Sequence, residues 1–169
     1  MILRLSQKLC TKVKADKLID MPLAENPLLD WSATLFRLGR TEYTLLCNTS
    51  TLYSCVAPSK GVNTNSQLVA RVSKIIQESM VADGYGEVFE RFMAPGSQEV
   101  RFAKALNRTV VGSMNELILV ASSVLSASET SLSEVGSDLN GTLLSALGQR
   151  KGDYGEPKDA FATLVKSLP

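Results

Sequence analysis

The 169-residue sequence contains no histidine. This absence excludes Ser-His-Asp and Cys-His catalytic arrangements, HExxH metal sites and acid–base catalysis by imidazole. Its three cysteines, Cys10, Cys47 and Cys55, show neither a CxxC pair nor the spacing of a zinc site. We therefore expect three buried free thiols in a reducing cytoplasm, and neither a metal site nor a cofactor.

Glycine-rich phosphate motifs are also missing, because neither the Walker A pattern nor GxGxxG occurs. The formal net charge is only +1, so the sequence lacks the electrostatic footprint of a dedicated duplex nucleic-acid binder. Charged residues interrupt the opening segment too often for a signal peptide, and no uninterrupted apolar run approaches membrane-spanning length. We expect neither a membrane partner nor a strong nucleic-acid interaction.

The composition is that of an ordinary globular domain, with 44% hydrophobic and 21% charged residues. The length suits a single domain, 1–169, in which 126–169 forms a less regular helical C-terminal extension. The first segment has a basic bias that we expect to form the solvated face of a helix; its cations are Arg4, Lys8, Lys12, Lys14 and Lys17.

The clearest β signal lies between residues 33 and 56. Gly39 stands where a two-residue type II′ hairpin needs a positive φ. That turn places Phe36 opposite Tyr43 and Arg37 opposite Glu42, an aromatic pair and an opposite-charge pair that both favour neighbouring strands.

A second reversal near Asn48, whose side chain can bond to the backbone of a turn, extends this hairpin to a meander over 33–56. Short strands are further expected at 1–5 and 99–103. Apolar periodicity and capping residues predict helices after Ser6, over 64–84, near 88–93 and ending before Pro95, over 108–125 and over 158–168. The predicted fold class is α+β, with an antiparallel sheet of about four to five strands packed by several helices.

A polar cluster precedes the long helix. Lys104, Asn107 and Arg108 bring two cations and an amide to its first turn, where free N–H groups already favour an anion. Asn115, off the apolar stripe of that helix, either lies on the surface or faces a cleft with them. The plainer alternative is that Asn107 only caps the helix while both cations are solvated. Trp31, the only tryptophan, is expected to pack in the core.

Three stretches resemble a bacterial family catalogued only as a domain of unknown function. They are MILRLSQKL, NPLLDWSATLFRLGRTEYTLLCNTSTLYS and RFAKALNRTVVGSMNEL, within residues 1–125. The resemblance supplies no catalytic residues, and some relatives in that family are attached to plasmid-borne open reading frames. It falls on Trp31, Ala33, Leu35, Arg40, Asn48, Phe102, Lys104, Asn107, Arg108 and Asn115, which adds Trp31, Arg40 and Asn48 as further candidates for a site.

We expect a non-catalytic binding or interaction module that holds an anionic ligand or partner near Lys104 and Arg108. One alternative is a small enzyme acting on a phosphorylated or nucleic-acid substrate, which would need a carboxylate such as Glu99, Glu116 or Asp30 beside these residues. A structural homodimer is the second alternative.

Overall fold

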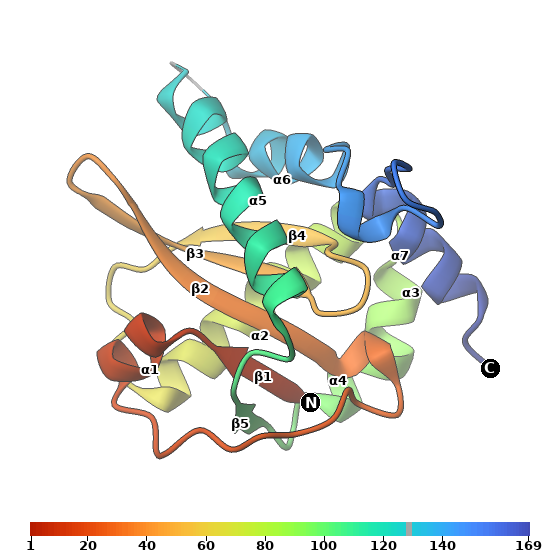
Figure 1. Cartoon of the computed structure of the whole chain (residues 1–169). Helices are drawn as coiled ribbons and strands as arrows, with labels where there is room; N and C mark the ends of the chain where they lie inside the picture. Colours follow the sequence, from red (N-terminus) through yellow and green to blue (C-terminus); the bar gives the residue numbers. More distant parts are fainter. Residues whose placement is uncertain (128–129) are drawn as a thin grey trace.

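The computed structural model describes residues 1–127 and 130–169. Its centre is a five-stranded sheet in the order β4-β3-β2-β1-β5 (Figure 1). The strands are β1 (Ile2–Leu5), β2 (Asp30–Leu38), β3 (Thr41–Asn48), β4 (Ser54–Pro58) and β5 (Arg101–Ala103).

The sheet is mixed, so the prediction of an antiparallel sheet was wrong in part. The expected meander is present, because β2, β3 and β4 pair antiparallel in sequence order. However, β1 runs parallel to both β2 and β5. These partners lie far apart in the sequence, and no turn motif between them signals their direction.

The central hairpin has the register that the sequence predicts. Phe36 lies opposite Tyr43 and Arg37 opposite Glu42. The two rings stack with centroids 5.4 Å apart, and Gly39 has a φ of +58° in the turn. Turn chemistry and cross-strand pairs therefore determine this register locally.

Helices cover both faces of the sheet (Figure 1). One face carries α1 (Gln7–Val13) and α2 (Asn65–Ala82), and the other carries α5 (Arg108–Ser126) and α6 (Leu132–Asn140). The remaining helical segments are η1 (Pro27–Leu29), α3 (Gly86–Val88), the π-helical η2 (Phe89–Met93), α4 (Ala94–Gly96), η3 (Ser145–Leu147) and α7 (Pro157–Lys166).

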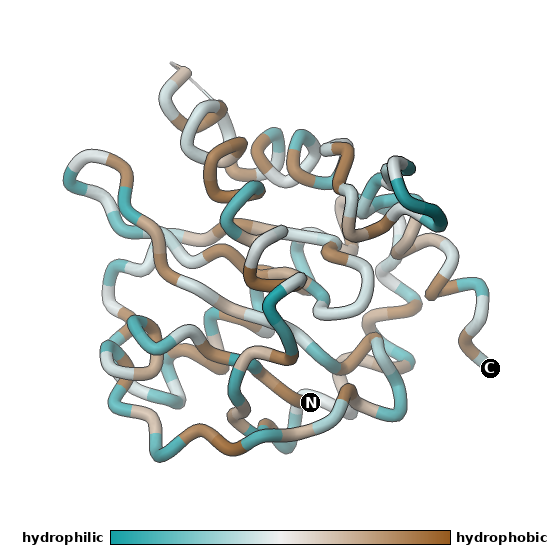
Figure 2. The backbone as a smooth tube through the Cα atoms, viewed as in Figure 1, coloured by the Kyte–Doolittle hydropathy of each residue, from teal (hydrophilic) through white to brown (hydrophobic). Residues whose placement is uncertain are grey.

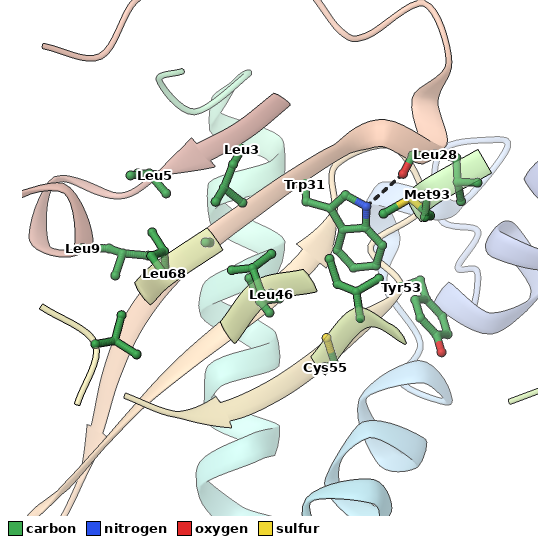
Figure 3. Close-up of a cluster of buried hydrophobic side chains, with 14 of the residues drawn as sticks. Leu3, Leu5, Leu9, Leu28, Trp31, Leu46, Tyr53, Cys55, Leu68 and Met93 are labelled. Atoms are coloured by element: carbon green, nitrogen blue, oxygen red, sulfur yellow. Dashed lines mark hydrogen bonds between the residues drawn. The ribbon is translucent and has the colours of Figure 1, made fainter. Parts of the chain in front are cut away.

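Trp31 anchors the core on the α2 face, as predicted (Figure 3). Its indole Nε1 donates a 2.8 Å hydrogen bond to the carbonyl of Leu28, so its one polar atom is satisfied inside the core. Tyr53 meets Trp31 edge-on and stacks on Phe161 of α7 with centroids 4.2 Å apart. The C-terminal helix is thereby joined to this core.

The second core lies between the sheet and α5. Val110, Met114, Leu117 and Ala121 are the apolar residues that α5 buries, and Figure 2 shows apolar segments recurring along the helix. Within the described residues, α5 alone is long and apolar enough to cross a membrane by length and composition. Leu119 on its outer side is 72% exposed.

Three local expectations need correction. The stretch after the serine-rich segment is a regular helix, α6, because Ser131 and Glu134 form a reciprocal capping box and Gly136 is accommodated inside it. The short helix near 88–93 does not end before Pro95 but continues to Gly96, since proline is tolerated in the first turn of α4. The last strand of the meander expected over 33–56 begins at Ser54 and continues past residue 56, to Pro58.

All three cysteines are buried and free, as predicted. Burial raises the pKa of the Cys47 thiol to about 12 and also raises that of Cys55. Because the thiolate is the reactive form, burial disfavours nucleophilic chemistry at both thiols.

Candidate functional site

Two of the four candidate residues lie at the start of α5, and Lys104 lies in the loop before it. Asn107 is the N-cap, and its Oδ1 accepts a 2.9 Å hydrogen bond from the N–H of Val110, which confirms the capping role. Arg108 is the first residue of the helix and is exposed. It forms no ion pair in the part of the chain that the structure describes.

Lys104 has a partner that sequence reasoning missed. Its Nζ lies 2.8 Å from Oδ2 of Asp20, and both side chains are largely exposed. Its backbone N–H donates to the carbonyl of Ile19, which brings the two segments together. An exposed pair of this kind is weak and open to exchange. Asp20 therefore partly neutralises Lys104, whereas Arg108 has no ion-pair partner within the described residues.

A crevice of about 60 Å³ lies between the first turns of α5 and the sheet. Ser6, Ser32 and Thr34 give it polar groups from the end of β1 and from β2. Its other side is lined by Ala105 from the loop after β5 and by α5 residues that include Val110, Met114 and Asn115. Asn115 is exposed and lies at this crevice, but Lys104, Asn107 and Arg108 do not line it, so the expected cleft shared by Asn115 with the two cations is not seen.

The crevice lies beyond the carboxyl end of β1. The helix that follows β1, α1, packs on one face of the sheet, whereas α5, which follows the neighbouring parallel strand β5, packs on the other. In open sheets with parallel strands, ligands bind where the connections of adjacent strands diverge in this way. The topology therefore places the crevice at a position typical of ligand sites.

A buried ion pair, Arg4 with Asp30, lies beside the crevice. Arg4 is 1% exposed, and its Nε and Nη2 donate to the two carboxylate oxygens of Asp30 at 2.7 and 2.8 Å. The prediction that Arg4 belongs to a solvated helix face was wrong. Its position in β1, opposite Ser32 of β2, directs it onto the covered face of the sheet.

Arg4 uses all five of its N–H donors. Beyond Asp30, they reach the carbonyls of Met21, Pro22 and Lys104 at 3.0, 2.7 and 3.2 Å. Arg4 therefore has no donor left for a ligand. Instead, it ties the loop before β2 and the loop after β5 to the end of the sheet, which fixes the rim of the crevice.

Asp30 was one of the carboxylates considered as a catalytic base. Both of its oxygens are engaged, Oδ1 by Arg4 and Oδ2 by Arg4 and the N–H of Ala24. Glu99 and Glu116 are exposed. None of these three lines the crevice.

Trp31, Arg40 and Asn48 do not join the cluster. Trp31 is fully buried on the α2 face, and Arg40 is exposed in the hairpin turn. Asn48 is buried, where its Nδ2 donates to the carbonyls of Pro27 and Asp30 while its Oδ1 accepts from Ser50 and Thr51. Asn48 is thus the turn-bonding residue that the sequence predicts.

Fold and crevice together define an α+β structure with a small crevice, lined mainly by apolar side chains and by a few hydroxyl groups, near the end of its parallel strands. The chain belongs to the family described as "Domain of unknown function (DUF6933)", whose model matches residues 2–160. No curated protein and no solved structure matches the chain.

Proposed function

We propose that this protein is a non-catalytic binding module that holds a small anionic group of its ligand in the crevice at the start of α5. The observation that carries the proposal is the position of the crevice, beyond the carboxyl end of β1 and against the first turns of a 19-residue helix. The positive end of the helix dipole and the free N–H groups of that turn favour an anion.

Two cations flank the crevice along the chain without lining it, and they support an anionic ligand. Lys104 directly precedes the lining residue Ala105, and Arg108 lies two residues before Val110. Arg108 is exposed, and Asp20 only partly neutralises Lys104. Arg4 and Asp30 compensate each other and contribute no net charge. The local field is therefore positive, and hydroxyls of Ser6 and Thr34 can donate to anionic oxygens.

The size of the crevice limits what enters it. A space of about 60 Å³ holds only a few water molecules. A single phosphate or carboxylate group fits, while the rest of a larger ligand would remain outside.

The engagement of Asp30 and the absence of a carboxylate from the described lining favour binding over the enzymatic alternative. The buried free thiols fit a cytoplasmic location.

A thermal-shift panel of inorganic phosphate, nucleotides and phosphorylated metabolites tests the proposal. Ligand at about 100 times its Kd stabilises the folded state by about 2.7 kcal/mol. We expect such a shift for the native chain and its loss in Arg108→Ala and in Ala105→Leu, which adds side-chain volume to the lining of the crevice. Arg40→Ala removes an equally exposed cation at the hairpin turn and should retain the shift. Equal shifts in all variants would contradict the proposal.

A further inference from the structure

The β2–β3 hairpin extends past the end of β1 (Figure 1). β1 pairs with β2 only from Ile2↔Asp30 to Leu5↔Ala33, and the N–H of Ser6 closes this pairing by donating to the carbonyl of Ala33. β2 continues for five more residues, 34–38, that pair with β3 on the opposite side. This half of β2 is therefore a sheet edge.

The hydrogen bonds of β2 show which backbone groups face that edge. The carbonyl of Asp30 accepts from Thr49 on the β3 side, whereas the carbonyl of Ala33 accepts from Ser6 on the β1 side. Backbone groups alternate between the two neighbours along a strand. Leu35 and Arg37 therefore direct their N–H and C=O groups to the open edge. In the described part of the chain, these groups have no hydrogen-bond partner there.

An open groove of about 650 Å³ runs along this edge. One wall is the outer side of α1, with Gln7, Lys8, Thr11 and Lys12, and the other is formed by Leu35, Phe36 and Arg37 of β2 and by Glu42 of β3. The groove thus combines unpaired strand backbone with an apolar floor. An extended peptide needs both.

The groove has an excess of positive charge. Lys12 lies 2.5 Å and Arg37 3.6 Å from the carboxylate of Glu42, so one acidic group serves two cations. Lys8 is exposed and has no ion-pair partner within the described chain. Three cations against one carboxylate favour an acidic occupant.

We propose that an extended acidic segment of a protein partner adds to the free edge of β2 as a further strand, in the groove between α1 and the hairpin. The unpaired groups of Leu35 and Arg37 match a peptide backbone, which nucleic acid would leave unsatisfied. This surface is separate from the crevice, since none of the residues that line the groove also lines the crevice.

Selection of random 12-residue displayed peptides on the native chain, followed by amide hydrogen exchange, tests this proposal. We expect the selected peptides to be rich in Asp and Glu. Their binding should slow exchange of the Leu35 and Arg37 amides, which exchange fast in the free protein. The amides of Thr34 and Phe36, which face β3, should be slow throughout.

Two substitutions at one exposed position separate backbone pairing from charge. Arg37→Thr removes the cation and keeps the N–H, whereas Arg37→Pro also removes the N–H at a site where an edge strand tolerates proline. Arg37→Pro should weaken binding of the selected peptides about tenfold more than Arg37→Thr does. A tenfold change in Kd corresponds to about 1.4 kcal/mol of binding free energy. An unchanged thermal midpoint shows that the proline variant is folded.

Several results would overturn the proposal. These are selection without acidic enrichment, bound peptides that leave the Leu35 and Arg37 amides in fast exchange, or equal binding by the two variants. Tighter binding of a single-stranded oligonucleotide at the same lysines would identify a different occupant. A native dimer on a sizing column that Arg37→Pro converts to a monomer would assign the edge to a second copy of the chain.

Discussion

The side chain of Asn140 pairs with the backbone of Ser54 as a neighbouring strand would. Its Oδ1 accepts the N–H of Ser54 at 2.7 Å, and its Nδ2 donates to the carbonyl of the same residue at 3.1 Å. Both residues are buried. Helix α6 thus covers the outer edge of β4, in contrast to the open edge of β2, and satisfies the polar groups that this edge would otherwise leave unpaired.

Replacing Asn140 by alanine should therefore destabilise the protein by about 1–3 kcal/mol, because the N–H and C=O of Ser54 would lose their partners while buried. Urea denaturation measures this change. Asn63→Ala is the matched control, since Asn63 is exposed, and its effect should stay within about 0.5 kcal/mol. Equal stabilities of the two variants would show that the pairing contributes nothing.

The buried pair Arg4 and Asp30 should behave as a unit. Arg4→Met or Asp30→Asn alone leaves a buried charge without its partner and should cost about 3–5 kcal/mol. The double variant should lose less than the sum of the two single changes. Strict additivity in a denaturation cycle would contradict a direct coupling between them.

Gly112 and Gly148 both lack a positive φ, and their replacement by alanine should change the stability of the protein in opposite directions. A Cβ at Gly112 in α5 meets nothing within 4 Å, so Gly112→Ala should stabilise the protein by about 0.5–1 kcal/mol through helix propensity. A Cβ at Gly148 would lie 2.2 Å from the backbone carbonyl of Asp153, and Gly148→Ala should destabilise by about 1–3 kcal/mol. Thermal midpoints of both variants check the sign.

The ion pair of Lys12 with Glu42 gives a small pH dependence. The hydrogen bond from Lys12 lowers the pKa of Glu42 below its ordinary value of 4.5. Because the folded-state pKa is the lower one, the resulting stability is present above pH 4.5 and is lost as the pH falls through the lowered pKa. Both side chains are about a quarter exposed, so the effect is about 0.5 kcal/mol.

Glu42→Gln should therefore be less stable than the native chain at pH 7 and equal to it in strong acid. Denaturation midpoints at several pH values measure the difference. A gap between the two proteins that is constant with pH would place its origin in packing and not in the charge of Glu42.

The structural features predicted correctly from the sequence are those that depend on residues close together along the chain. Gly39, Phe36 and Tyr43 lie within one hairpin, and their turn chemistry fixed their register correctly. Ser6 and Asn107 cap their helices through local hydrogen bonds. These features depend on contacts a few residues apart.

The parts that the sequence did not predict depend on contacts between distant segments. Arg4 was placed on a surface because the parallel pairing of β1 with β2, which covers it, has no local signal. For the same reason, Asp20 was not foreseen as the partner of Lys104. A signal was present for the open edge of β2, since the predicted hairpin is longer than the strand at 1–5 that pairs with it.

Titration of inorganic phosphate into ¹⁵N-labelled protein tests the central claim, an anion site in the crevice, most directly. The account predicts saturable shifts of the amides of Ala105, Arg108 and Thr109, at the start of α5, that Arg108→Ala weakens and Arg40→Ala leaves unchanged. Small, linear shifts spread over the exposed lysines, identical in both variants, would contradict it.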